Sequence, residues 1–521
     1  MPALFFLAIS FAELSNEHVR PAHRNICFGK KGGSMGVRRG RSRRIAVHGS
    51  LPGRSLYLRA LVVFALLFLF TGCQSMLPQI QPPLQDEGEV LLYVEPFVQE
   101  AGRLRFGIEG IFARSVDGSE YPFSLKLTDL RGREMTRQRF LGEAELPPGL
   151  YEGFRLKVKD AFLRGEGGEA ALLVPQTPVT ISFPFRVEKR RASVLSFAFR
   201  TGGAVRGGFS FRPDFFVSIP PRPVSGLTGY ATNRASNTIT IFDKKAGEVA
   251  GVIATEGGPA GIALDQTGLK AYVAVPAADA VEVVDVIASE ITDRIRFTLG
   301  DRPEALALTA DGKTLLSTNT GSNTVSIIDT ASLAERGRVT VGNGPEWVLV
   351  DSLGRRAYVL NRMSSSVSVI DIANRALVTT IGTDSGPLRC QINSQGDTLY
   401  VVHEWSPYMS LIDTGKLSVK RMPVTMGLRS IKIDTATGLI YMGRVGDRSV
   451  GVYDPNALVP VDYIGAGGDV TDMAIDGDMN NLLMVGRDSM RLDIVNLISR
   501  KTLSVIDVGE APHQVAVMGG R

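Results

Sequence analysis

This sequence of 521 residues is poor in the side chains that carry disulfide, haem and metal chemistry. It has three cysteines and five histidines, and no Cys-x-x-Cys-His motif. Covalently attached haem and a framework of several disulfides are therefore excluded. We predict no cofactor, no metal site and no catalytic residue from the remaining His, Cys, Asp and Glu pattern. Asp476 to Asn480 has acidic spacing like a calcium loop, but the glycine and glutamate that such a loop needs are missing.

Long hydrophobic runs are also scarce in the N-terminal region. The run ALVVFALLFLF at 60–70 has eleven residues, too few to cross a bilayer as a helix. Arg54 and Arg59 precede this run and Thr71-Gly72-Cys73 follows it, which is the pattern of a secretory signal peptide. We therefore predict a leader over 1–72, in which 1–34 look like a mis-assigned start.

The end of this leader resembles a bacterial lipobox, although Phe70 stands where leucine is usual. The resemblance implies that Cys73 is the acylated first residue of the mature chain. Gln74 is compatible with sorting to the outer membrane, by analogy with some Gram-negative lipoproteins. A plain signal peptide or a membrane anchor is the alternative.

A net positive charge is lacking outside the leader. The formal charge of the chain is +5, but residues 1–72 hold eleven Lys and Arg against two Glu, which leaves the rest acidic. The basic pI thus belongs to the leader, and we predict no nucleic-acid partner. Lys189-Arg190-Arg191 is a charge run that we interpret as a solvated hairpin tip in preference to a headgroup site.

What the chain does contain is a repeat of about forty-two residues in its C-terminal three-fifths, a period typical of β-propellers. One strand of each unit ends in an acidic residue or its amide. These strands are TITIFD (238–243), AVEVVD (280–285), TVSIID (324–329), SVSVID (366–371), YMSLID (408–413), SVGVYD (449–454) and RLDIVN (491–496). Because the acid recurs at one position, we assign it to the following turn, where it accepts backbone N–H groups, and not to catalysis.

The two ends of the repeat region predict how the ring closes. It opens at Gly229 with the second, third and fourth strands of a unit, and it ends with a lone first strand, PHQVAV at 512–517. That lone strand completes the first blade, so the sequence predicts seven blades of four strands and no open edge. Cys390 lies inside an apolar first strand and is expected to be buried and inert.

The stretch GDRPEALALTADGKTLLSTNTGSNTVSIIDTAS at 300–332 resembles the YVTN-type β-propeller repeat of bacteria and archaea. The resemblance covers roughly 229–521 and is weakest in the last two units, which have IYMGR and LLMVG as second strands. It implies binding or scaffold roles more often than catalysis. Lactonase, quinoprotein and haem-nitrite-reductase propellers look similar, which leaves an enzyme as the alternative.

Residues before the repeat predict a tether and a second β domain. The segment 73–88 is polar and Pro-rich, as a tether is. About seven strand-like runs follow within 89–221 and predict an antiparallel β-sandwich. The segment ELPPGLYEGFRLKV at 145–158 is similar to an edge of transthyretin-like lipoprotein domains. The predicted fold is therefore all-β, with a β-sandwich followed by a seven-bladed β-propeller over 222–521.

Aligning the first strands gives a candidate binding surface at one mouth of the ring. Charged and aromatic residues begin several first strands, and an atypical loop follows His403. Exposed Trp, Tyr and Arg favour recognition surfaces, whereas ordinary blade packing is the alternative. The candidate residues are Glu304, Glu346, Trp347, Arg389, Arg429, Asp472, His513, His403, Trp405 and Tyr408.

These observations predict a non-enzymatic lipoprotein of the bacterial cell envelope. Its lipid would hold it on a membrane, most simply the outer membrane facing the periplasm or the surface. The propeller would then bind a protein or polysaccharide partner. The alternative is a periplasmic lactonase-like enzyme in which Glu304, Glu346 and His513 supply acids and bases.

Overall fold

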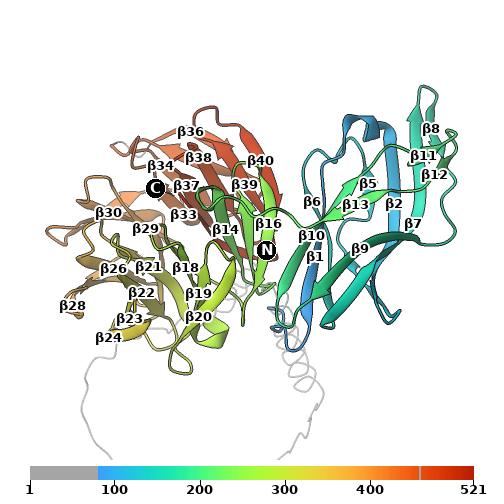
Figure 1. The fold of residues 1–521 in the computed structure, drawn as a ribbon. Coiled ribbons are helices and arrows are strands. Elements are labelled where there is room, and N and C mark those ends of the chain that lie inside the picture. Colours follow the sequence, from blue (N-terminus) through green and yellow to red (C-terminus); the bar gives the residue numbers. More distant parts are fainter. Residues whose placement is uncertain (1–79, 457–458, 521) are drawn as a thin grey trace, which may run out of the picture. The chain divides into compact units, whose positions relative to one another are not determined.

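A computed structural model describes residues 80–456 and 459–520 and shows an all-β chain (Figure 1). The described residues form forty-one strands and only three short helices of the 3-10 type, η1 (Gln99–Arg103), η2 (Ser225–Leu227) and η3 (Pro276–Ala278). No helix among these residues has both the length and the apolar character needed to traverse a membrane. The predicted leader, Cys73 and the first part of the tether lie outside the described residues.

The N-terminal region contains two larger sheets that bury one core. One sheet has the order β13 (Phe215–Ser218), β10 (Ala192–Phe199), β1 (Gly88–Val94), β6 (Arg139–Leu146) and β4 (Ser124–Leu125). The other joins β2 (Leu104–Ser115) and β7 (Gly149–Gly165) to β3 (Glu120–Pro122), β5 (Asp129–Arg131), β8 (Gly168–Ala171) and β9 (Val179–Val187). A small hairpin of β11 (Val205–Arg206) and β12 (Ser210–Phe211) lies apart from both.

Aromatic side chains fill the core between these two sheets. Phe106 and Phe154 from one sheet and Phe197 from the other are fully buried in a single cluster. The rings of Phe154 and Phe197 meet edge to face with centroids 5.1 Å apart, a favourable arrangement of aromatic pairs. Tyr151 of the LPPGLY segment is also buried here, and its hydroxyl donates to the carbonyl of Pro147 at 2.8 Å.

One strand pair in this region differs from the antiparallel prediction. β1 runs parallel to β10, with Leu91 opposite Val194. These strands are separated by almost a hundred residues of other strands, and such a long connection is what a parallel pair requires. The sequence pattern of each strand gives no sign of its partner's direction.

The C-terminal region consists of four-stranded antiparallel sheets that match the repeat, as in propeller blades. One sheet joins β16 (Glu248–Ala254), β15 (Thr238–Asp243) and β14 (Thr228–Asn233) to β41 (Pro512–Val517). The other sheets each take four consecutive strands: β17 (Ile262–Asp265), β18 (Lys270–Val275), β19 (Ala280–Asp285), β20 (Glu290–Arg296); β21 (Pro303–Leu308), β22 (Thr314–Asn319), β23 (Thr324–Asp329), β24 (Ala334–Thr340); β25 (Pro345–Val350), β26 (Arg356–Asn361), β27 (Ser366–Asp371), β28 (Ala376–Gly382); β29 (Pro387–Ile392), β30 (Thr398–His403), β31 (Tyr408–Asp413), β32 (Val419–Pro423); β33 (Leu428–Ile433), β34 (Ile440–Arg444), β35 (Ser449–Tyr453), β36 (Pro460–Gly465); β37 (Asp472–Asp476), β38 (Asn481–Val485), β39 (Arg491–Asn496), β40 (Thr502–Asp507).

The first strands of these sheets contact one another in a closed cycle. β17 contacts β21, the contacts continue through β25, β29, β33 and β37, and β41 contacts both β37 and β17. The first strands therefore lie at the centre of this cycle of contacts. β41 pairs with β14, so the two ends of the repeat region share one sheet.

The acidic residue that ends each third strand has the structural role that the sequence predicts. Asp243 Oδ1 accepts the N–H groups of Lys245 and Ala246 at 2.8 and 2.9 Å. Its counterparts bond the following turn in the same way, namely Asp285, Asp329, Asp371, Asp413, Asp454 and Asn496. This prediction is confirmed, and the strand-terminal carboxylates are committed to turns. Cys390 is buried, also as predicted.

Candidate functional site

Strand register brings two sets of residues to the same edge of the propeller sheets. Pro345, which begins a first strand, pairs with Asn361, which ends a second strand. Pro387 and His403 are paired in the same way in the next sheet. The residue after each proline therefore lies beside the residue after each second strand. We call this edge the mouth and define it by Arg234, Glu304, Glu346, Trp347, Arg362, Arg389, Glu404, Trp405, Arg429, Arg487 and His513, together with Lys432 further along its first strand.

Arg234 and Glu304 form one ion pair at the mouth. The guanidinium of Arg234 donates to both carboxylate oxygens of Glu304, at 2.5 and 3.1 Å. His513 Nε2 lies 3.7 Å from the same carboxylate. Two-pronged arginine–carboxylate pairs have a fixed geometry, so this glutamate is already held by its neighbours.

Two further glutamates are linked through arginines. Arg362 Nη1 donates to both oxygens of Glu346 at 2.9 and 3.1 Å. The other end of the same guanidinium donates to Glu404, which also accepts from Arg429 Nη2 at 3.0 Å. The chain of contacts runs from one blade to the next and positions residues from three sheets.

Two tryptophans at the mouth are each stacked under an arginine. The Cζ atom of Arg389 lies 4.4 Å from the ring centre of Trp347. The Cζ atom of Arg362 lies 4.9 Å from the ring centre of Trp405, whose side chain is 49% exposed. Such stacking adds cation–π attraction and fixes the ring orientation.

Not every cation at the mouth has a counter-charge. Arg389, Arg487 and Lys432 make no ion pair with any carboxylate of the described residues, although each is half-buried. Arg389 Nη1 donates to the carbonyl of its chain neighbour Leu388 at 3.0 Å. The buried Nε atoms of Arg362, Arg389 and Arg429 and the indole Nε1 of Trp347 lack partners within the described chain.

Burial and the neighbouring arginines shift the pKa values of several groups at the mouth. Burial holds the pKa of His513 well below its usual value, and Arg234, Arg389 and Arg487 lower it further. His513 is therefore neutral at pH 7. Burial likewise lowers the pKa of Arg487, with Arg234 and Arg429 acting in the same direction. Burial raises the pKa of Asp472 to about 6, although Arg389 and Lys432 oppose that rise.

The structure does not bring all ten predicted residues together. Glu304, Glu346, Trp347, Arg389, Arg429, His513 and Trp405 meet at the mouth. Asp472 is buried and accepts the N–H of Val515 at 3.0 Å. Tyr408 is packed under Arg421, with the Cζ atom 4.5 Å from its ring centre.

His403 lies inside its sheet and not on the mouth surface. It is 1% exposed, and its ring nitrogens lie 3.0 Å from the carbonyl of Tyr408 and 3.4 Å from the hydroxyl of Ser410. In a neighbouring blade Asn361 occupies the same strand end and donates to Ser366 and Ser368. His403 thus replaces a structural asparagine of the repeat.

Four residues of the site escaped the sequence analysis, namely Arg234, Arg362, Lys432 and Arg487, whereas Glu404 belongs to the atypical loop after His403. Like Glu404, Arg234, Arg362 and Arg487 follow the end of a second strand, a position that the alignment of first strands does not sample. Aligning those positions across the repeats would have shown an arginine or glutamate in four of the copies. Lys432 lies on a first strand, two residues beyond the aligned positions.

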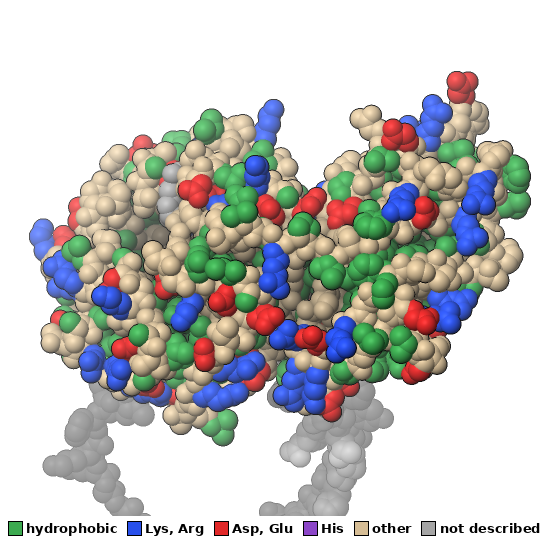
Figure 2. All heavy atoms as spheres, viewed as in Figure 1, with side chains coloured by type: hydrophobic (Ala, Val, Ile, Leu, Met, Phe, Trp, Pro, Cys, Tyr) green, Lys and Arg blue, Asp and Glu red, His purple; other side chains and the backbone are tan. Residues whose placement is uncertain are grey.

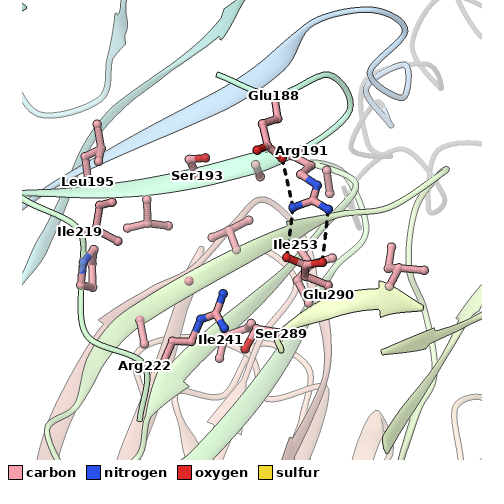
Figure 3. A pocket seen from close by; sticks show the side chains of 18 of the residues that line it. Glu188, Arg191, Ser193, Leu195, Ile219, Arg222, Ile241, Ile253, Ser289 and Glu290 are labelled. Carbon is pink, nitrogen blue, oxygen red and sulfur yellow. Dashed lines mark hydrogen bonds and ion pairs between the residues drawn. The ribbon is translucent and has the colours of Figure 1, made fainter. Parts of the chain in front are cut away.

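Elsewhere the charged surface is mixed. Figure 2 shows Lys and Arg side chains interspersed with Asp and Glu over the face in view. A cavity of about 790 Å³ is lined by the hairpin around 188–191 and by Ile241 and Ile253 (Figure 3). Arg191 there donates to Glu290 at 3.1 Å and pairs with Glu188, and all three side chains are exposed. These are ordinary surface ion pairs, so we place the candidate site at the mouth.

Comparison with known proteins supports the propeller. Residues 227–433 match the family described as YNCE-like beta-propeller. No curated protein matches the sequence. This part of the chain is therefore a β-propeller domain similar to that family.

Several solved structures are similar to part of this chain at low identity. Hydrazine synthase of Kuenenia stuttgartiensis is 20% identical with a TM-score of 0.46, over 55% of this chain and 93% of that one. A protein of unknown function from Desulfotomaculum acetoxidans is 12% identical with a TM-score of 0.49, over 56% and 98%. A putative 6-phosphogluconolactonase from Bacteroides uniformis is 15% identical with a TM-score of 0.47, over 56% and 98%. All three are too distant in sequence to transfer an activity.

Proposed function

We propose that this chain is a lipoprotein of the bacterial cell envelope, anchored at Cys73, whose propeller mouth binds a protein or polysaccharide partner. The lipobox-like sequence supports the anchor. Two sheets sharing one core support a β-sandwich over 89–221, and four-stranded sheets whose first strands form a closed cycle support seven blades over 222–521. The outer membrane is the proposed location.

The exposed ring of Trp405 is the observation that carries a binding role. This ring is 49% exposed, yet Arg362 holds one face and Gly386 approaches it closely from the backbone. A tryptophan that is already oriented loses little conformational freedom when a partner covers it. Tryptophan and arginine at the centre of a surface are also the residue types that dominate binding energy.

A lactonase-like enzyme is the less favoured alternative. Glu304 and Glu346 each accept hydrogen bonds from an arginine on both carboxylate oxygens. A general base needs a carboxylate or imidazole that is free to take a proton. His513 is neutral but buried beside three arginines, which oppose its protonation.

The test compares capture of envelope polysaccharide and envelope protein by immobilised wild type and by Trp405→Ala. Truncating a central aromatic costs ~2 kcal/mol or more of binding, so we expect about thirtyfold weaker capture. Tyr463→Ala is the matched control, because Tyr463 is a 58% exposed aromatic on the outer strand β36. Equal capture by Trp405→Ala and wild type would contradict the proposal. Lactone hydrolysis that is lost in Glu346→Gln would favour the enzyme.

A further inference from the structure

We infer that the mouth contains a site for a small oxyanion, a carboxylate or phosphate group, bound by Arg389 and Arg487 with Lys432 deeper in the channel. This site does not include Trp405. The proposed partner can supply the anionic group, but a free anion would fit the same chemistry.

The first step is the imbalance of charges. Each glutamate of the mouth is already shared: Glu304 with Arg234, Glu346 with Arg362, and Glu404 with Arg362 and Arg429. No described carboxylate remains within ion-pair distance of Arg389, Arg487 or Lys432. Half-buried cations without a counter-charge cost free energy, because burial removes part of their hydration.

The second step is that Arg389 and Arg487 lie at the same edge of the closed cycle of first strands, the edge at which the second strands end. Burial lowers the pKa of His513, and the positive charges of Arg234, Arg389 and Arg487 all lower it further. Burial raises the pKa of Asp472, and the positive charges of Arg389 and Lys432 both act against that rise. Asp472 offsets part of this positive charge, since burial raises its pKa only to about 6, but no ion pair joins it to Arg389 or Lys432 among the described residues.

The third step is the surplus of donors. The Nε atoms of Arg362, Arg389 and Arg429 and the Nε1 of Trp347 are buried without an acceptor among the described residues. A buried donor left unpaired destabilises the folded chain, and an acceptor ligand removes that cost. An oxyanion offers several acceptor lone pairs and negative charge at once, and planar guanidinium groups match its geometry.

The strand geometry gives the site depth. Lys432 is two residues beyond Ser430, which takes the same register position in β33 as Arg389 does in β29. A strand advances about 3.3 Å per residue, so Lys432 lies roughly 7 Å deeper in the channel. An anion held by Arg389 and Arg487 is thus backed by a further positive charge.

The experiment measures binding of inorganic phosphate and of succinate by calorimetry and by thermal shift, against chloride at equal ionic strength. Comparing phosphate with succinate shows whether the site prefers a phosphate or a carboxylate group. We expect at least one of them to raise the melting temperature of the wild type. In Arg487→Gln we expect about tenfold weaker binding or more, because a charge-assisted hydrogen bond is lost. Arg421→Gln is the matched control, since that arginine stacks on Tyr408 and pairs with Asp384.

A second variant separates a binding role from a structural one. Arg487→Met removes an uncompensated cation, so it should raise the melting temperature in anion-free buffer and abolish the anion effect. A residue needed only for folding would lower that temperature. Unchanged anion affinity in Arg487→Gln, or no stabilisation of the wild type by either anion, would overturn the inference. Trp405→Ala should keep its anion affinity, which distinguishes failure of this site from failure of partner binding at Trp405.

Discussion

Gly386 shows how a single glycine positions the exposed side chain of Trp405 at the mouth. Gly386 has φ +69°, and a Cβ built on it would lie 2.7 Å from Trp405 Cε3. Alanine is strained in this backbone conformation and would also displace the ring. We expect Gly386→Ala to lower stability by about 1 kcal/mol or more and to shift Trp405 emission to longer wavelength.

The control for this prediction is Gly382→Ala. A Cβ at Gly382 meets no atom within 4 Å. The chain has two tryptophans, so emission is recorded in a Trp347→Phe background. Emission that is identical in Gly386→Ala and Gly382→Ala would show that residue 386 does not position the ring.

Glu89 makes stability depend on pH. This side chain of β1 is 8% exposed, and burial raises its pKa to about 8, with Glu143 and Glu145 adding to the rise. The folded state therefore holds the proton more tightly than the unfolded state, whose carboxyl has a pKa near 4.5. The contribution of the Glu89 carboxyl to the free energy of unfolding is fully present below pH 4.5. This contribution is lost as pH rises toward 8, by roughly 1 kcal/mol per pH unit.

The substitution Glu89→Gln tests this dependence. Glutamine carries no charge, so urea unfolding between pH 5 and pH 8 should show a shallower loss of stability in the variant than in wild type. Glu100→Gln is the control, since Glu100 is an exposed residue of η1. Parallel pH profiles for wild type and Glu89→Gln would contradict the raised pKa.

At the scale of elements, a buried ion pair connects the first and last parts of the propeller region. Lys244 Nζ, which follows β15, donates to Asp476 at 2.8 Å and to the carbonyl of Met518 at 2.7 Å. Asp476 ends β37, and the two side chains are 1% and 0% exposed. Lys244→Met leaves a buried carboxylate without its cation, which typically costs ~3–5 kcal/mol.

A double-mutant cycle measures the coupling of this pair. We expect Lys244→Met combined with Asp476→Leu to recover part of the lost stability, because an apolar pair of similar volume removes the stranded charge. Urea unfolding of the two single variants and the double variant gives the coupling. Additive losses would mean that the pair does not connect these elements.

The sequence predicts those elements whose contacts are local in the chain. The turn bonds of Asp243 and its counterparts join residues two or three apart, so one repeat unit contains both partners. The mouth is different, because Glu404 meets arginines from two other blades. Which residues meet there depends on the register of strands in neighbouring sheets. His403 shows the converse, since an unusual residue in a repeat can simply perform the usual structural task.

At the scale of the whole molecule, the predicted acylated cysteine, Cys73, differs from the buried free cysteine, Cys390. Cys73 belongs to the lipobox-like sequence, whereas Cys390 is buried in β29 and burial raises the pKa of its thiol. A buried neutral thiol is a poor nucleophile and is out of reach of a modifying enzyme. Acylation should therefore be specific for Cys73.

We expect Cys73→Ser to move the mature protein from the membrane to the soluble fraction, or to stall its processing. Cys390→Ala should leave it on the membrane, with the same incorporation of labelled fatty acid as wild type. One acyl chain gives only marginal membrane binding, so stable anchoring requires more than one. Intact mass of the wild type should therefore show an added mass of several acyl chains on the N-terminal peptide. Wild-type protein without added lipid, or a Cys73→Ser variant that remains on the membrane, would contradict the anchor while leaving the mouth to be tested in solution.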